Sequence, residues 1–156
     1  MRHLLLTICA LLTISSLCSA QNIRLGERLP DINVTSELGM QLDLITQKYV
    51  CLVFVHSESL PCITALEEFQ GFCATYGDRM ATVLITAEQR SDEQEVMSRF
   101  VNKNTSLAFD DNRRTFNAFG INYVPFGVIY ETKRRKAVWF GSLRQLHAKE
   151  LESILK

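Results

Sequence analysis

The feature that most constrains the fold is an almost uninterrupted apolar run, YVCLVFVH, which extends from Tyr49 to His56. Its valines and its phenylalanine favour an extended strand, and a strand without alternating polar residues is typical of one that is buried on both faces. Met80 to Ala87 predicts a second strand of this kind. Because helices must then cover both faces of a sheet whose first strands are parallel, the sequence indicates an α/β fold.

The segment between these two runs predicts a helix that Gly77 ends. Its apolar residues recur at spacings of three and four, which places them on one helix face. They are Cys62, Leu66, Phe69, Cys73 and Tyr76. A second helix is expected from Ser91, with Gln94 placed for a capping box. Its expected apolar face consists of Val96, Met97, Phe100 and Val101.

The rest of the chain predicts shorter elements within one compact domain. Residues 24–48 indicate an irregular lead-in with short extended pieces. The elements expected after residue 101 are a short strand at Leu107–Phe109, a short helix at Asp110–Phe119 stopped by Gly120, a hairpin of Pro125–Thr132 with Ala137–Phe140, and a final helix at Ser142–Leu155. The residues expected to face inward from the final helix are Leu143, Leu146, Leu151, Ile154 and Leu155.

The first twenty residues are expected to be a signal peptide that is cleaved after Ala20, which leaves a single domain at 21–156. Arg2 precedes an apolar run too short to span a membrane, and small residues lie three and one before the cut. We therefore predict export to the periplasm or beyond the cell, with no transmembrane segment in the mature chain. Lipid anchoring through Cys18 is the alternative, but Leu17 is larger than a lipoprotein signal favours.

Export would leave three cysteines in a compartment that permits disulfides. Cys62 and Cys73 would lie about 16 Å apart along one helix, and a disulfide needs Cα atoms closer than about 7 Å. A pair of Cys51 with Cys62 is disfavoured because roughly 17 Å of strand lies between Cys51 and His56. We therefore interpret Cys51 and Cys73 as core residues.

Charge indicates no nucleic-acid partner, since 17 basic residues balance 17 acidic ones. The one basic run, Lys133 to Lys136, lies between two expected strands. It is interpreted as a solvated hairpin turn, with a patch for an anionic partner as the alternative.

Three segments in order resemble one family over nearly all of the mature chain: LGERLPDINVT, CLVFVHSESLPC and FDDNRRTFNAFGINYVPFGVIYE. Together they are similar to the thioredoxin fold of the exported TlpA/ResA-like redoxins, which are thiol-disulfide oxidoreductases. The resemblance implies a central mixed sheet with helices on both faces. It also implies that Pro61-Cys62 is the second half of a C-x-P-C motif, and that Val124-Pro125 is a cis pair facing it.

The family's chemistry needs two cysteines at the start of a helix, where backbone N–H groups and the helix dipole favour thiolate. The first cysteine attacks a substrate disulfide and the second resolves the mixed disulfide. Here Ser59 stands at the first position. Glu58, Val53 and Ala65 replace a tryptophan and two acidic residues that the resemblance implies. The degenerate site predicts that dithiol chemistry is lost.

Two hypotheses remain. In the first, Cys62 is a lone thiol that forms mixed disulfides with a partner, beside Ser59. In the second, the chain is a noncatalytic module that binds a peptide or protein, and Cys62 packs as a small apolar residue. The groove residues that the resemblance implies are Pro61, Tyr123, Val124, Pro125 and Phe126.

Other chemistries have weaker support. Ser59 to Cys62 also fits half of a peroxiredoxin motif, but Val55 stands where its proline would be, and Arg113 and Arg114 lie in the wrong segment for its arginine. His56 and His147 have no visible ligand set around them, so no metal and no cofactor are expected.

Overall fold

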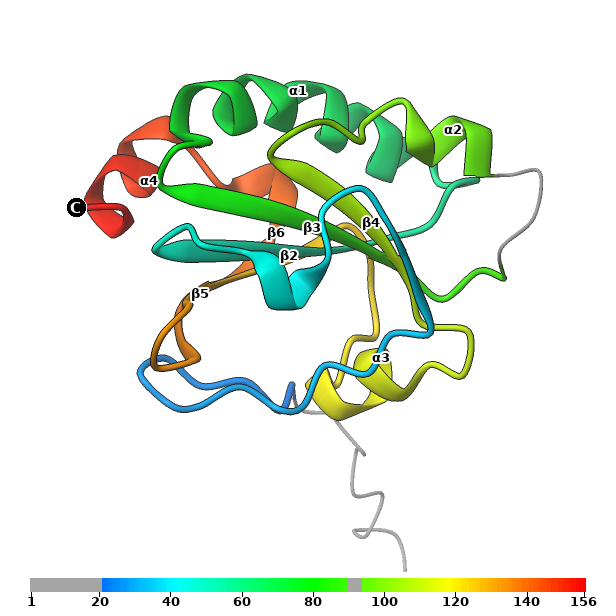
Figure 1. The fold of residues 1–156 in the computed structure, drawn as a ribbon, viewed down its shortest axis with the longest axis horizontal. Coiled ribbons are helices and arrows are strands. Elements are labelled where there is room, and N and C mark those ends of the chain that lie inside the picture. Colours follow the sequence, from blue (N-terminus) through cyan, green and yellow to red (C-terminus); the bar gives the residue numbers. More distant parts are fainter. Residues whose placement is uncertain (1–20, 90–93) are drawn as a thin grey trace, which may run out of the picture.

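The computed structural model describes residues 21–89 and 94–156. Figure 1 shows their arrangement as a sheet between two helical layers. The strands are β1 (Ser36–Leu38), β2 (Tyr49–Val55), β3 (Met80–Thr86), β4 (Thr105–Phe109), β5 (Phe126–Glu131) and β6 (Lys136–Ser142). The helices are α1 (Leu60–Tyr76), α2 (Gln94–Ser98), α3 (Arg114–Phe119) and α4 (Ala148–Ile154), with 3-10 turns at Leu42–Leu44 and Leu143–Gln145.

Within the described residues, six strands form one sheet in the order β1-β4-β3-β2-β5-β6. β2 and β4 both run parallel to β3, as the sequence predicts for the first strands. β5 and β6 are antiparallel neighbours beyond β2, and β1 pairs antiparallel with β4 at the other edge. The mixed sheet and the basic hairpin turn between β5 and β6 are both confirmed.

β2 lies at the centre and separates two hydrophobic cores. All seven of its residues are at most 7% exposed, which confirms a strand buried on both faces. Cys51 and Val53 pack into the core beneath α1, and Leu52 and Phe54 pack into the core beside α3. In Figure 1, α1, α2 and α4 cover one face of the sheet, and α3 covers the other together with the lead-in.

α1 begins and ends where the sequence predicts. Ser59 is its N-cap, with a proline following in the first turn, and Gly77 is its C-cap. The Ser59 hydroxyl accepts a bond of 3.4 Å from the Cys62 N–H, and the Ser59 carbonyl accepts one of 2.9 Å from the same group. The predicted apolar face is confirmed, and Ala65 belongs to it.

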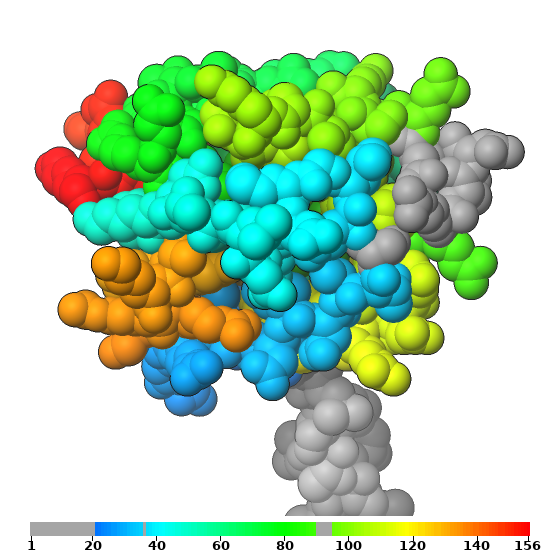
Figure 2. All heavy atoms as spheres, in the orientation of Figure 1, coloured from blue at the N-terminus to red at the C-terminus, as the bar shows by residue number. Residues whose placement is uncertain are grey.

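The lead-in is tied to the far half of the chain by backbone hydrogen bonds. The Gly26 N–H donates to the Ala137 carbonyl, and the Leu29 N–H donates to the Arg135 carbonyl, each at 2.8 Å. Figure 2 shows the lead-in, in blue, directly beneath the β5–β6 hairpin, in orange. Apart from β1, the lead-in is irregular with short extended pieces, as expected.

Three helix predictions need correction. The short helix predicted at Asp110–Phe119 begins only at Arg114, because the residues from Asp110 to Arg113 form a turn. The segment Ser142–Leu155 is not one helix, because Leu146 and His147 are extended between the 3-10 turn and α4. Despite this break, the segment buries Leu143, Leu146, Leu151 and Leu155. The leucine spacing therefore fits a broken helix as well as a continuous one.

In the region of α2, Val96 is 41% exposed and does not face the core, whereas Met97 and Phe100 are buried. Phe100 and Val101 follow the end of α2. Ser91 and the predicted signal peptide lie outside the described residues. Among the described helices, none is long and apolar enough to cross a membrane.

Candidate functional site

The turn from β2 into α1 presents no thiol to solvent. Cys62 is 0% exposed and belongs to the core beneath α1. The apolar residues at the surface are Leu60, which is 74% exposed, and Pro61. Ser59 is partly buried, and its hydroxyl is used to cap the helix. The predicted reactive residue therefore lies beneath the turn.

The two nearby positions that the resemblance expects to be acidic are packed apolar sites. Val53 is 0% exposed and Ala65 is 3% exposed, and both share the core of Cys62. A carboxylate at either position would need partners that these apolar surroundings do not provide. The cysteine and its neighbours thus form continuous hydrophobic packing.

The segment before β5 has mixed exposure. The Val124–Pro125 peptide bond is cis, the isomer that the resemblance implies. Tyr123 is 46% exposed, while Phe126 is 1% exposed and makes an edge-to-face contact with the Tyr123 ring at 5.2 Å. Phe126 is therefore a core residue and not a groove residue, because β5 turns its side chain inward. Pro125 is buried and Val124 is partly buried.

The other two cysteines are core residues, as predicted. Burial raises the pKa of Cys51 well above its ordinary value, and the neighbouring Cys73 raises it further. Burial also raises the pKa of Cys73, although its contact with the Thr82 hydroxyl opposes that shift. The Cys73 Sγ lies 3.3 Å from the Thr82 Oγ1. All three cysteines of the described chain are free thiols.

A carboxylate that the sequence analysis missed, Glu88, joins the ends of β2 and β3. It accepts hydrogen bonds from the Ser57 N–H (2.9 Å), the Ser57 hydroxyl (2.5 Å) and the Thr86 hydroxyl (2.6 Å). The His56 Nδ1 lies 3.3 Å from the Oε1 of Glu88. Burial raises the pKa of Glu88, but the hydrogen bonds from Ser57 and Thr86, together with His56, outweigh it and hold the pKa below its ordinary value.

The His56 ring lies between two partners. Its Nδ1 is 3.3 Å from the Glu58 N–H, which can only donate, and 3.3 Å from the Glu88 carboxylate, which accepts. A bare Nδ1 accepts from the Glu58 N–H, and an Nδ1 that carries a proton donates to Glu88. His56 is half exposed, and it closes β2 as predicted.

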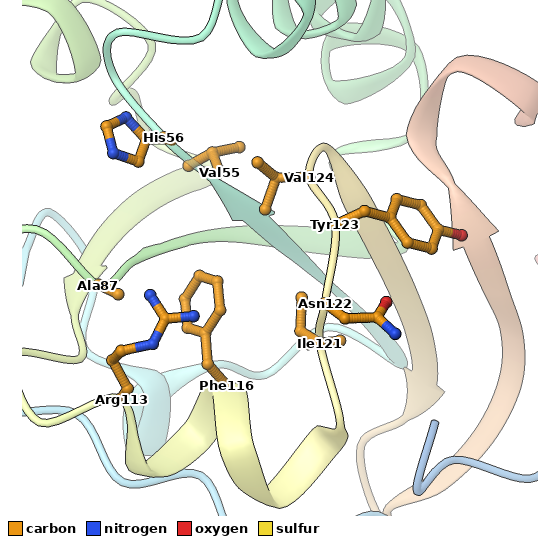
Figure 3. Close-up of a pocket in the computed structure, with 9 residues that line it drawn as sticks. All are labelled: Val55, His56, Ala87, Arg113, Phe116, Ile121, Asn122, Tyr123 and Val124. Carbon is orange, nitrogen blue, oxygen red and sulfur yellow. The ribbon is translucent and has the colours of Figure 1, made fainter. Parts of the chain in front are cut away.

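A pocket of about 130 Å³ opens on the α3 side of the same sheet edge. Figure 3 shows its apolar part formed by Val55, Phe116, Ile121 and Val124, with the His56 ring and the Arg113 guanidinium at its rim. The Tyr123 side chain points away from Arg113. Cys62, Ser59 and Pro125 do not line this pocket.

Topology could have located Glu88, since residues that follow adjacent parallel strands meet at one sheet edge. The position of Arg113 could not be predicted in this way. Its side chain reaches the pocket from a left-handed backbone conformation (φ 54°), which no sequence pattern indicates. Across residues 21–89 and 94–156, no three His, Cys, Asp or Glu side chains gather as metal ligands would.

No known family model and no curated protein matches this sequence. Solved structures do. A thioredoxin-like protein in its oxidised form is 18% identical, with a TM-score of 0.68 over 85% of this chain and 97% of that one. A Chlorobium tepidum protein assigned as the thiol:disulfide interchange protein DsbE is 17% identical, with a TM-score of 0.70 over 86% and 99%.

A secreted Mycobacterium tuberculosis disulfide oxidoreductase, described as homologous to Escherichia coli DsbE, is also similar. It is 18% identical, with a TM-score of 0.53 over 69% of this chain and 80% of that one. These likenesses extend over most of the described residues. They show that the chain has a thioredoxin-like fold.

Proposed function

We propose that this thioredoxin-fold chain is an exported relative of the TlpA/ResA-like redoxins that no longer performs dithiol chemistry and binds a protein or peptide partner without a covalent step. The observation that carries the proposal is the complete burial of Cys62. The serine at position 59 and the burial of Cys62 act together. Ser59 replaces the attacking thiol, and burial makes the remaining thiol inaccessible.

The chemical reason is that thiol-disulfide exchange requires a thiolate that can reach a disulfide sulfur. An alcohol at position 59 cannot form or break a disulfide, and its oxygen is already occupied at the helix N-cap. Cys62 would have to leave the core to meet a substrate. Noncovalent binding needs neither event.

The surface that remains is suited to contact with a chain. Leu60, Pro61 and Tyr123 are exposed, and Val124 is partly exposed beside the buried Pro125. Exposed apolar and aromatic side chains of this kind are enriched at binding surfaces. We assign the partner to this surface.

The decisive test is alkylation of the folded mature protein, residues 21–156, with each cysteine followed by mass spectrometry across pH. We expect Cys51, Cys62 and Cys73 to react only after unfolding. Rapid reaction of Cys62 in the folded state, with a midpoint well below about 8.5, would instead establish an accessible thiolate. The function would then be single-thiol exchange.

The Ser59→Cys variant tests the assignment of the site itself. If residues 59 and 62 correspond to the family's two cysteines, the variant gains an exposed thiol and a reducible bond between these positions. It should then reduce disulfides in a model substrate such as insulin. A correctly folded variant without a reducible bond would show that the two sites do not correspond.

Export is tested by the mass of the protein recovered from its native host. Cleavage after Ala20 predicts a chain that begins at Gln21. A diacylglycerol-modified Cys18 at the N-terminus would replace the released form with the lipid-anchored one. Recovery of the intact chain inside the cell would contradict both.

A further inference from the structure

We propose that the pocket beside α3 binds a small carboxylic acid, with an apolar group about the size of one benzene ring in the pocket and its carboxylate on Arg113. This inference does not rest on the proposed function. Cys62 and Ser59 do not line the pocket, and Phe116 and Ile121 belong to the core on the other face of the sheet.

The size and lining of the pocket favour a single apolar group. Its volume of about 130 Å³ is close to the roughly 150 Å³ of an apolar cavity that holds benzene. Phe116 and Ile121 are buried walls, and Val55 ends β2 against the opening. Val124 and Ala87 are partly buried beside them. A longer acid would have to extend into solvent.

The charge at the rim is available to a ligand. The Arg113 guanidinium lies 5.0 Å from the centre of the Phe116 ring, and no carboxylate of the described residues forms an ion pair with it. The nearby buried Asp110 is turned elsewhere, since its carboxylate accepts from the Phe116 N–H at 2.9 Å. A guanidinium that is stacked on an aromatic ring keeps its N–H fork free for an anion.

His56 is another polar group at the rim, and Figure 3 shows it across the opening from Ile121. Its Nδ1 lies 3.3 Å from the Glu88 carboxylate, so His56 already has an anionic partner. Among the residues that line the described pocket, Arg113 is therefore the cation that forms no ion pair with a described carboxylate. One unpaired cation above one apolar space suits a monocarboxylate.

The test is titration of the folded mature protein with phenylacetate, followed by NMR of the Val55, Ile121 and Val124 methyl groups. We expect saturable ring-current shifts at these methyls, and at least tenfold weaker binding of phenylacetamide, which lacks the charge. Absence of saturation by 10-fold molar excess at millimolar protein would overturn the proposal.

Three variants separate the two parts of the proposal. Arg113→Gln should weaken phenylacetate at least tenfold, to the level of phenylacetamide, whereas Arg114→Gln, at an exposed position outside the pocket, should not change it. Ala87→Leu should fill the pocket and abolish binding of both compounds. Full affinity in Arg113→Gln or in Ala87→Leu would overturn the assignment.

A short peptide that ends in phenylalanine distinguishes the source of the carboxylate. One outcome is that the peptide displaces phenylacetate at a concentration at least tenfold lower than that of phenylacetate, while the peptide with a C-terminal amide does not. In that case the pocket binds a peptide C-terminus, and its assignment to a small acid is wrong. If the peptide binds no more tightly than phenylacetate itself, the assignment of the pocket to a small acid is supported. None of these measurements depends on the reactivity of Cys62, so the two proposals can fail separately.

Discussion

The two sides of the sheet differ most at the edge where β2 ends. On the α1 side of this edge, the residues of the thiol motif close into a core, and the space beside it is about 10 Å³, which is barely enough for one water molecule. On the α3 side, the same edge holds a pocket of about 130 Å³ with a charged rim. At this edge, the side with the recognisable motif is closed and the side without one is open. A larger pocket on the α1 side, lined by Gln70, Cys73 and Asn102, lies at the opposite end of the strands.

This difference shows that a motif and an accessible site are separate properties of a fold. Cys62 keeps its place at the start of a helix, but packing withholds it. Arg113 has no motif around it, but a left-handed backbone and a stacking contact hold it over an opening. The function of each side therefore depends on the side chains that it exposes.

The largest expected effect comes from removing equal volumes from the two sides. Leu66→Ala, on the buried face of α1, should lower the free energy of unfolding by about 3–5 kcal/mol, because a closed core keeps the cavity. Ile121→Ala, at the pocket wall, should cost about 2 kcal/mol, which is the transfer term alone. Urea denaturation monitored by circular dichroism measures both, and equal losses would break the comparison.

Adding volume should show the same contrast with a smaller effect. Ala65→Leu places extra carbons in the closed core and should cost about 1–3 kcal/mol. Ala87→Leu extends toward the pocket and should change the free energy of unfolding by less than about 0.5 kcal/mol. A loss at Ala87 as large as that at Ala65 would mean that the pocket side is also tightly packed.

Glu88 lies at the junction of the two sides, and its replacement tests whether they share a support. Glu88→Gln should cost about 1–2 kcal/mol near neutral pH, because a charged acceptor of several hydrogen bonds is lost. The Glu88 pKa lies below its ordinary value of 4.5. Its contribution is therefore present above about pH 4.5 and is lost as the pH falls through the lower folded-state pKa.

The Glu88→Gln protein should accordingly lose less stability than the wild type between pH 5 and pH 3. Glu58→Gln is the matched control, since Glu58 is exposed and its side chain has no partner in the described chain. Thermal unfolding across this pH range measures the effect. Parallel curves for the wild type and Glu88→Gln would show that Glu88 is not the group responsible.

The smallest expected effect is at the helix cap of the closed side. Ser59→Ala should lower the free energy of unfolding by about 0.5–1 kcal/mol, because the hydroxyl bond of 3.4 Å is long and the backbone bond remains. Ser59→Gly should cost only a few tenths of a kcal/mol. If Ser59→Ala makes Cys62 reactive in the folded protein, the closure depends on the cap as well as on packing.

The sequence predicted most of the fold because local patterns decide it. The run from Tyr49 to His56 is buried except for its last residue, His56, and the stripe from Cys62 to Tyr76 buries every predicted residue. The break at Leu146–His147 could not be predicted, since the leucine spacing is satisfied on both sides of it.

The site was predicted less well, for a different physical reason. Cys62 and Ser59 could be named from their place before a helix, but their exposure depends on tertiary packing. The pocket depends on how α3 approaches the end of β2 and on a positive φ at Arg113. Neither feature has a periodic or compositional signal in the residues that form it.

The hydrogen bonds of the lead-in have a consequence for the order in which the protein is completed during synthesis. Residues near position 26 leave the ribosome early, but the groups that hold them lie about a hundred positions later. Until that downstream segment has emerged, the residues near position 26 lack their backbone hydrogen-bond partners, and the growing chain cannot complete its sheet. A chain that crosses a membrane while unfolded would benefit from this delay, since the fold is completed only when the last third of the chain has been synthesised.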